Sequence, residues 1–169
     1  STANDTITGD DQDNNLNGSS GNDTIAGGDG DDTITDTSGN NNLNGNDGND
    51  IVTAGGGNDT LRGGIGDDIV SGGNGDWDTV WDEEGFDVYD GGSGSRDAIR
   101  YDTSPGVTSI ELVLGDSTIT TVTVTGGDDD TIQNFERVWA TAGDDIVTGN
   151  SAYNELRLGA GEDLIYGSG

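Results

Sequence analysis

Apolar and polar positions recur along this chain with a period of nine residues. The stretch 27–35 reads GGDGDDTIT, and steps of nine residues find the same order repeatedly from the N-terminus to Ser71. In each unit the eighth position is aliphatic and the sixth is Asp or Asn. The aliphatic positions are Ile7, Leu16, Ile25, Ile34, Leu43, Val52, Leu61 and Val70. A strict short period of this kind is typical of a solenoid.

Each unit predicts one short strand and one tight turn. The residues around the aliphatic position are rich in Thr, Ile and Val, which suits a strand with its aliphatic side chain pointing inward. The glycine-rich half suits a turn, because glycine tolerates positive φ. Two units therefore make one coil, and the inward side chains are expected to stack in two columns. These columns are Ile7, Ile25, Leu43 and Leu61, and Leu16, Ile34, Val52 and Val70.

The nine-residue register loosens in two later units, which carry one extra residue before their Asp. We interpret Trp77 and Arg96 as bulged residues that leave Asp78 and Asp97 in the sixth position. An unbulged register would instead put Trp77 and Arg96 in the sixth position, and neither unit would then have an Asp there. A regular unit, 82–90, lies between the two bulges.

The repeats stop in the middle of the chain. Two alternating stretches, 107–114 and 118–125, flank a Gly-Asp pair and predict a β-hairpin. The stretch 131–138 predicts either one short helical turn or a loop leading back to the repeats. We expect one continuous solenoid domain with a first block at 1–100, an interrupting hairpin segment at 101–139 and a second block at 140–169.

Composition alone would predict disorder. The formal charge is −29, with 34 acidic residues against 5 basic ones, and hydrophobic residues make up only 28% of the chain. Low hydrophobicity with high net charge is typical of disordered chains. The regular period argues for order, so something outside the chain must supply the missing stability. A divalent cation is the obvious candidate for so many carboxylates.

The type of carboxylate narrows the choice of metal. Asp outnumbers Glu by 28 to 6, and the short Asp side chain at a fixed place after glycine suits a tight metal-binding loop. The chain has no His and no Cys. Hard oxygen donors alone favour calcium and make zinc, iron or copper sites improbable.

Several function classes are disfavoured by the same residues. The charge of −29 would repel nucleic acid and anionic membranes, and no apolar run approaches the roughly 18 residues of a membrane span. Ser/His and Cys/His triads cannot form without His or Cys. An EF-hand starting at Asp29 would lack both the glycine at loop position six and the Glu at position twelve. Two of Glu83, Glu84, Glu136 and Glu155 could form the carboxylate pair of a hydrolase. Solvated charge in a loop or at the edge of a repeat is the better interpretation of these four residues. We therefore expect no enzyme.

The phased GGxGxDxUx units resemble the RTX family of hemolysin-type calcium-binding repeats, over roughly 1–100 and 140–169. The resemblance implies an all-β, right-handed parallel β-roll with calcium in the turns, held by sixth-position side chains and turn carbonyls. The side-chain ligands it implies are Asp5, Asp23, Asp32, Asp50, Asp59, Asp68, Asp145 and Asp163, together with Asp78 and Asp97 in the looser units and Asp87 in the regular unit between them. Weaker sites are expected at Asn14, Asn41 and Asn154, and carbonyl donors at Gly28, Gly30, Gly57, Gly64 and Gly66.

Calcium is expected to be a condition for folding. One aliphatic residue per nine cannot offset a chain entropy of about 1–2 kcal/mol per ordered residue. If about ten ions bind, the formal charge of −29 falls to roughly −9. Binding and folding should therefore be one event.

Three roles fit such a module. The first is a structural segment of an adhesin, surface layer or biofilm matrix, and the second is the folding and export module of a secreted enzyme or toxin. The third is a glycan- or receptor-binding module, for which Trp77, Trp81, Trp139 and Tyr101 could form a sugar-stacking surface, unless they pack the hairpin or an open roll end.

The chain begins and ends within a repeat and shows no polar cap, so we expect head-to-tail self-association, or else a shortened chain. The resemblance further implies an extracellular or cell-surface location in a Gram-negative bacterium, reached by type I secretion.

Overall fold

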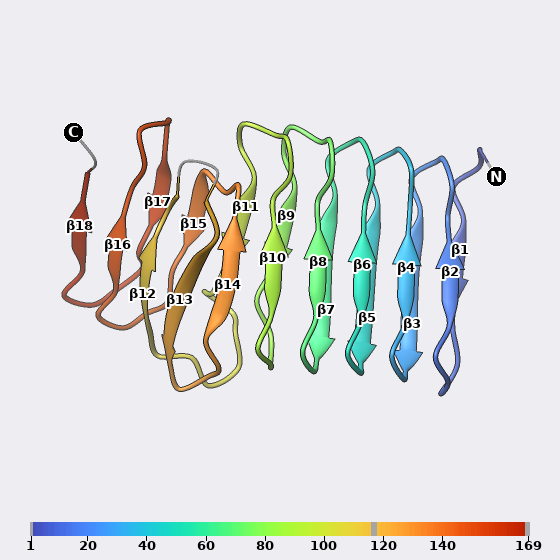
Figure 1. Ribbon diagram of the computed structural model, residues 1–169, viewed down its shortest axis with the longest axis horizontal. Helices are drawn as coiled ribbons and strands as arrows, with labels where there is room; N and C mark the ends of the chain where they lie inside the picture. The colour runs from blue at the N-terminus through green and yellow to red at the C-terminus, as the bar shows by residue number, and fades with distance from the viewer. Residues whose placement is uncertain (1, 116–117, 168–169) are drawn as a thin grey trace.

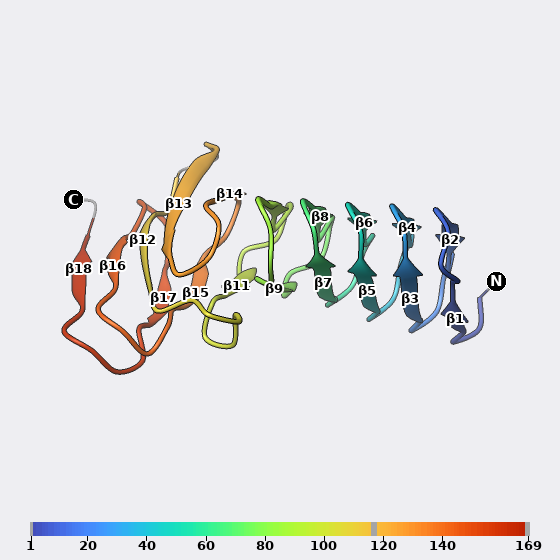
Figure 2. The same ribbon diagram turned by 90° about the horizontal axis from the view of Figure 1, so that it is seen from below.

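The computed structural model describes residues 2–115 and 118–167, which form an elongated solenoid of two facing sheets (Figures 1 and 2). The first sheet has the order β1-β3-β5-β7-β9-β11-β15-β17, and the second has the order β18-β16-β12-β13-β14-β10-β8-β6-β4-β2. Strands pair in parallel except at the β12–β13 and β13–β14 contacts. The predicted all-β parallel solenoid is confirmed. Within the described ranges no helix is long and apolar enough to cross a membrane.

The strands are short because each spans only one repeat. The first sheet contains β1 (Thr6–Thr8), β3 (Thr24–Asp29), β5 (Asn42–Asp47), β7 (Thr60–Ile65), β9 (Thr79–Trp81), β11 (Ala98–Arg100), β15 (Arg137–Trp139) and β17 (Glu155–Arg157). The second contains β2 (Asn15–Asn17), β4 (Thr33–Thr35), β6 (Ile51–Thr53), β8 (Ile69–Ser71), β10 (Val88–Asp90), β12 (Ser109–Val113), β13 (Thr120–Thr125), β14 (Asp130–Gln133), β16 (Ile146–Thr148) and β18 (Leu164–Tyr166).

The two predicted columns of inward side chains form the core. Ile7, Ile25, Leu43 and Leu61 are partners in consecutive strands of the first sheet, and Leu16, Ile34, Val52 and Val70 are partners in the second. From Ile25 onward these side chains are fully buried. The aliphatic position therefore fixes the register of every coil.

The structure has the bulged register at both loose units. Leu61 pairs with Val80 and Val80 pairs with Ile99, so each of these coils has 19 residues instead of 18. Trp77 is 45% exposed, whereas Asp78 and Asp97 are buried. The extra residue is accommodated outside the core, and the column of inward side chains continues without a break.

The predicted hairpin is present as β12 and β13, and it belongs to the second sheet. Strand β13 pairs antiparallel with β14, β14 pairs in parallel with β10, and β12 pairs in parallel with β16. The first sheet passes directly from β11 to β15. The middle segment thus adds strands to one sheet and keeps the solenoid continuous (Figure 1).

The prediction of a helical turn or loop at 131–138 is wrong. This stretch contains most of β14 and the start of β15, joined by a turn at Asn134, which has φ of 58°. Ile132 pairs with Tyr89 and Val138 pairs with Ile99, so both residues continue the core columns. Their six-residue spacing replaces the usual nine, and the repeat pattern therefore gives no sign of them.

Candidate metal centres

Tight turns connect the two sheets along both long edges of the roll. Turns of the first edge lead from the first sheet to the second and include 9–14, 27–32, 45–50, 63–68 and 82–87. The strands β3, β5 and β7 extend into the first three residues of their turns. Turns of the second edge lead back and include 18–23, 36–41, 54–59, 72–78 and 91–97. Each turn ends on its sixth-position residue, so these side chains stack along the two edges.

One oxygen of each sixth-position side chain joins neighbouring coils. In the first edge, the backbone N–H of Asp32 donates to Oδ1 of Asp50, and the N–H of Asp50 donates to Oδ1 of Asp68, both at 2.7 Å. In the second edge, the same bond joins Asp59 to Asp78 and Asp78 to Asp97, at 2.8 Å. The remaining bonds of this inner ladder join Asp5 to Asp23, Asp23 to Asn41, Asn41 to Asp59, Asn14 to Asp32 and Asp68 to Asp87.

The other oxygen of these carboxylates has no partner within the described part of the chain. Oδ2 is buried without a hydrogen bond in Asp23, Asp32, Asp50, Asp59, Asp68, Asp78 and Asp97. A buried polar atom without a partner costs free energy, and a charged one costs more. Because the same atom is left over in coil after coil on both edges, the missing partner is a regular feature of the fold.

The first glycine of a turn leaves open the space that the free oxygen faces. A Cβ atom added to Gly45 would overlap with Oδ2 of Asp50 and with the carbonyl oxygen of Gly63, one coil further on. Gly27 has the same relation to Asp32 and to Gly45. A carboxylate oxygen and a backbone carbonyl therefore converge on one small volume between two coils. Calcium takes six to eight ligands of this kind, so the residues present fit the ion.

Four copies of the RTX calcium-binding nonapeptide repeat match this chain, at residues 1–34, 26–61, 44–76 and 139–169. The chain belongs to the RTX repeat family. The search among curated proteins gave no match. The RTX β-roll is a calcium-binding structural fold rather than a catalytic family. The matched copies leave out 77–138, the part that contains both bulges and the hairpin.

Burial and mutual repulsion make four of these RTX carboxylates, those of Asp50, Asp59, Asp68 and Asp78, hard to ionise without a cation. Burial raises the pKa of Asp50 and Asp59 to about 6, and it raises the pKa of Asp78 to about 7. The pKa of Asp68 rises to about 8, first through burial and then through the charges of Asp87 and Asp50. Hydrogen bonds from the backbone oppose the shift without cancelling it. A bound calcium ion would remove both penalties.

The structure gives a physical reason for weaker sites at the three Asn positions. The amide group of Asn41 donates from Nδ2 to the carbonyl oxygen of Gly39, and Asn14 donates to the carbonyl oxygen of Gln12. Asn154 donates to Oδ1 of Asn150. In each of these Asn residues the Nδ2 group has a hydrogen-bond acceptor within its own turn. An Asp in the same position would have an oxygen without a partner there.

The predicted carbonyl donors lie in left-handed backbone that only glycine adopts easily. Gly28, Gly30, Gly57, Gly64 and Gly66 have φ values of 127°, 107°, 136°, 126° and 132°. The carbonyl oxygens of Gly30, Gly57 and Gly66 face the next coil. In that coil a Cβ atom added to Gly48, Gly75 or Gly85 would overlap with the carbonyl oxygen of Gly30, Gly57 or Gly66, respectively. The sequence pattern did not reveal the carbonyls of Gly45 and Gly63, which face the free Asp oxygens.

Two of the predicted ligands differ from the others. Asp145 uses both oxygens within the protein: Oδ1 accepts bonds from the backbone of Ile110 at 2.8 Å and from the hydroxyl of Thr141 at 2.9 Å, and Oδ2 accepts the N–H of Thr141 at 3.1 Å. In Asp87, Oδ2 accepts the hydroxyl of Tyr89 at 2.6 Å. Among the described residues, Asp163 has the ladder bond alone, from the N–H of Asp145 at 3.1 Å.

A second ladder runs outside the first and was not foreseen. The N–H of Asn49 donates to Oδ1 of Asp31 at 2.9 Å, and the N–H of Asp67 donates to Oδ1 of Asn49 at 2.8 Å. Here the side chain bonds to the following coil, whereas the sixth-position side chain bonds to the preceding one. The signal was present, because the fifth position is Asn or Asp in every unit from Asn4 to Asp67.

Arginine and tryptophan alternate across the outer face of the first sheet. Arg62, Trp81, Arg100, Trp139 and Arg157 are successive partners on β7, β9, β11, β15 and β17. Each guanidinium lies 3.9–5.5 Å from the centre of a neighbouring Trp ring of this row. The sugar-stacking hypothesis required Tyr101 on this surface, but Tyr101 is buried, and its hydroxyl donates to Asp130.

Proposed function

We propose that this chain is a calcium-dependent structural module of a secreted or cell-surface protein, such as an adhesin, a surface layer or a biofilm matrix. The observation that carries the proposal is the row of buried carboxylates, each with one free oxygen, along both edges of the roll. In this proposal calcium ions, about ten in number, fill the turns and complete the fold.

The distribution of charge supports calcium as a condition for folding. All five arginines lie on or beside the outer face of the first sheet, so none of them neutralises the buried Asp residues of the edges. Without an external cation, folding would bury like charges side by side. The chain would therefore remain unfolded at low calcium and fold where calcium is abundant.

This behaviour fits export through type I secretion, which is typical of RTX proteins. An unfolded chain passes a secretion channel, and calcium outside the cell then folds it. The same property would serve the second role considered above, an export and folding module attached to a secreted enzyme or toxin. The roll has no need of a catalytic group in either role.

Circular dichroism and isothermal titration calorimetry test the proposal together. We expect a disordered spectrum in EGTA, a β-rich spectrum in millimolar calcium and several ions bound per chain in the same concentration range. A β-rich spectrum that excess EGTA leaves unchanged would refute it.

Self-association forms part of the structural role. Leu164, Ile165 and Tyr166 on β18 are about half exposed, and such a surface is covered when a further coil stacks on it. That coil can come from the same protein or from a second copy. Sedimentation velocity in calcium and in EGTA tests the second case: calcium-dependent oligomers support it, and monomers at all concentrations oppose it.

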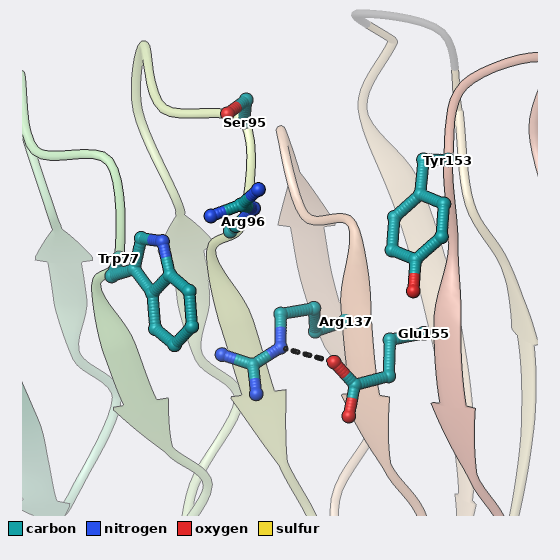
Figure 3. A pocket seen from close by; sticks show the side chains of 6 residues that line it. All are labelled: Trp77, Ser95, Arg96, Arg137, Tyr153 and Glu155. Carbon is teal, nitrogen blue, oxygen red and sulfur yellow. Dashed lines mark hydrogen bonds and ion pairs between the residues drawn. The ribbon is translucent and has the colours of Figure 1, made fainter.

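A second candidate function is the binding of an anionic sugar beside the first sheet. Trp77, Ser95, Arg96, Arg137, Tyr153 and Glu155 surround a hollow there (Figure 3). Tyr153 is 73% exposed, so its ring is available for stacking on a sugar. The ring of Trp77 already has the guanidinium groups of Arg96 and Arg137 at 5.3 and 5.0 Å from its centre. The guanidinium groups of Arg96 and Arg137 could pair with a sugar carboxylate or sulfate.

Titration with a uronic-acid or sulfated oligosaccharide tests this function. Arg137 already pairs with Glu155 at 3.1 Å, so Arg96→Gln is the better variant. We expect Arg96→Gln to abolish binding and Arg62→Gln, which lies on β7 outside the hollow, to retain it. Equal binding by both variants, or no binding by the parent chain, would refute the function.

A further inference from the structure

Three buried carboxylates meet where the inserted segment joins the roll. Asp82 and Asp87 belong to the first-edge turn between β9 and β10, and Asp130 begins β14. Their exposed fractions are 2%, 2% and 1%. Each offers a carboxylate oxygen, and the three oxygens lie within 4.8 Å of one another. The fold thus brings Asp130 next to Asp82 and Asp87, which lie 48 and 43 positions earlier in the chain.

Two buried tyrosines hold this group in position. The hydroxyl of Tyr89 donates to Oδ2 of Asp87 at 2.6 Å, and the hydroxyl of Tyr101 donates to Oδ2 of Asp130 at 3.1 Å. Oδ1 of Asp130 accepts the backbone N–H of Asp87 at 3.1 Å. Hydrogen bonds of this kind orient the carboxylates of a metal site from its second shell.

Asp82 supplies an oxygen with no partner. Its Oδ2 is buried and accepts no hydrogen bond from any described residue. Asp82 also stands at the first position of its turn. The equivalent residues of the two preceding first-edge turns are Gly45 and Gly63, which have no side chain and leave this space open. Among the first-edge turns, this one alone has a carboxylate in place of the glycine, and it lies beside the other two carboxylates; on the second edge, Asp36 likewise stands first in its turn with a buried Oδ2 that has no partner among the described residues.

Nothing in the described protein balances these charges. The ion pairs among residues 2–115 and 118–167 are Arg62–Glu83, Arg100–Asp102, Arg137–Glu155 and Arg157–Glu155, and none includes the three Asp residues. Three like charges this close cannot all be buried as ions without a cation. A proton shared between Asp82 and Asp130 would relieve part of the repulsion, whereas a divalent cation would relieve more and would engage all three side chains.

We propose that Asp82, Asp87 and Asp130 form a calcium site of their own, separate from the nonapeptide sites, that fastens the inserted segment to the roll. Three hard carboxylates without nitrogen or sulfur donors suit calcium. The site builds on the calcium dependence proposed above and adds a consequence. Because Asp130 opens β14, and β14 pairs with β10, the ion would make the attachment of the middle segment depend on calcium.

Native mass spectrometry in calcium tests the site by counting ions. We expect Asp82→Asn and Asp130→Asn each to bind one ion fewer than the parent chain, and the exposed control Asp128→Asn to bind the same number. Asp82→Asn is the more informative variant, because its free oxygen makes no hydrogen bond that the fold needs. Equal counts in the parent and in Asp82→Asn would overturn the proposal.

Hydrogen exchange and crystallography separate this inference from the proposed function. In calcium, Asp82→Asn should raise amide exchange in 120–133 by about tenfold or more while 24–71 stays protected. A crystal structure grown in calcium should show an ion bound by all three carboxylates. A direct contact between Asp82 and Asp130 without an ion, in a chain whose nonapeptide turns hold calcium, would overturn this inference and leave the proposed function intact. A chain that binds no calcium anywhere would overturn both.

Discussion

The backbone N–H of Asp50 donates to Oδ1 of Asp68 at 2.7 Å, while Oδ2 of Asp68 is buried without a hydrogen-bond partner. The two oxygens of one carboxylate therefore have different tasks. One joins successive coils, and the other faces the space between them, where a cation would bind. This division explains why Asn can stand at position 41: its oxygen keeps the ladder bond from the N–H of Asp23, and its amide group donates to Gly39 where an Asp would have a free oxygen.

Replacing Asp50 by Asn should separate the two tasks. The Asn oxygen can still accept the N–H of Asp32, so the folded state should form in high calcium. The calcium affinity of the turn should fall by about tenfold or more, because a charged ligand is lost. Calorimetric titration against the exposed control Asp47→Asn measures the difference. Identical titrations of the two variants would show that Asp50 is not a ligand.

Adding one methyl group to the first glycine of a turn should block a calcium site. A Cβ atom on Gly45 would overlap with Oδ2 of Asp50 and the carbonyl oxygen of Gly63, whereas a Cβ atom on Gly56 would meet nothing within 4 Å. Neither glycine has positive φ, so backbone strain does not confuse the comparison. We expect Gly45→Ala to raise the calcium concentration for half-folding several-fold, and Gly56→Ala to leave it unchanged within error. The circular dichroism signal followed against calcium decides between them.

Acid should partly replace calcium. In the folded chain without calcium, the pKa values of Asp50, Asp78 and Asp68 are about 6, 7 and 8, above the ordinary value near 4. Raised folded pKa values favour the protonated form, so their contribution to stability is complete below about pH 4 and is lost as the pH rises through 6 to 8. In EGTA, the β-rich signal should therefore be larger at pH 4 than at pH 8.

The same protons should oppose calcium. Because ions and protons compete for the carboxylates of the folded chain, the calcium concentration for half-saturation should rise as the pH falls, over the acidic range in which the chain is already folded without calcium. Calcium titrations at several pH values check this opposite trend. A midpoint that does not move with pH would contradict the assignment of the buried Asp residues as ligands.

The core columns should dominate stability once calcium is bound. Leu43 is fully buried between Ile25 and Leu61, and truncation to Ala should cost about 2–5 kcal/mol. Ile51 lies on the neighbouring sheet with 44% of its surface exposed, so Ile51→Ala should cost far less. Urea unfolding in saturating calcium measures both. Equal losses would mean that the columns do not carry the core.

The regular part of the fold could be predicted because one nine-residue unit determines one strand and one turn. Ile25 and Ile34 reach the two sheets as expected, and the bulge at Trp77 follows from the need to keep Val80 in its column. The strands around Ile132 and Val138 could not be predicted, because a six-residue spacing carries no repeat signal. Asp130 was missed for a related reason: its place beside Asp87 depends on the pairing of β14 with β10, which only the folded chain reveals.

The paired arginines and tryptophans make the molecule electrically two-sided. All five guanidinium groups gather on or beside one outer sheet face in the C-terminal two-thirds of the chain, while the carboxylates of both edges remain acidic. A body with this charge distribution aligns when it approaches a charged surface. Four of the arginines are paired with Glu83, Asp102 or Glu155, so this face carries less net negative charge than the edges. An anionic polymer would approach through that face, and cations would collect along the edges. The module could therefore be held in a fixed orientation by a negatively charged matrix while its calcium sites stay open to the medium.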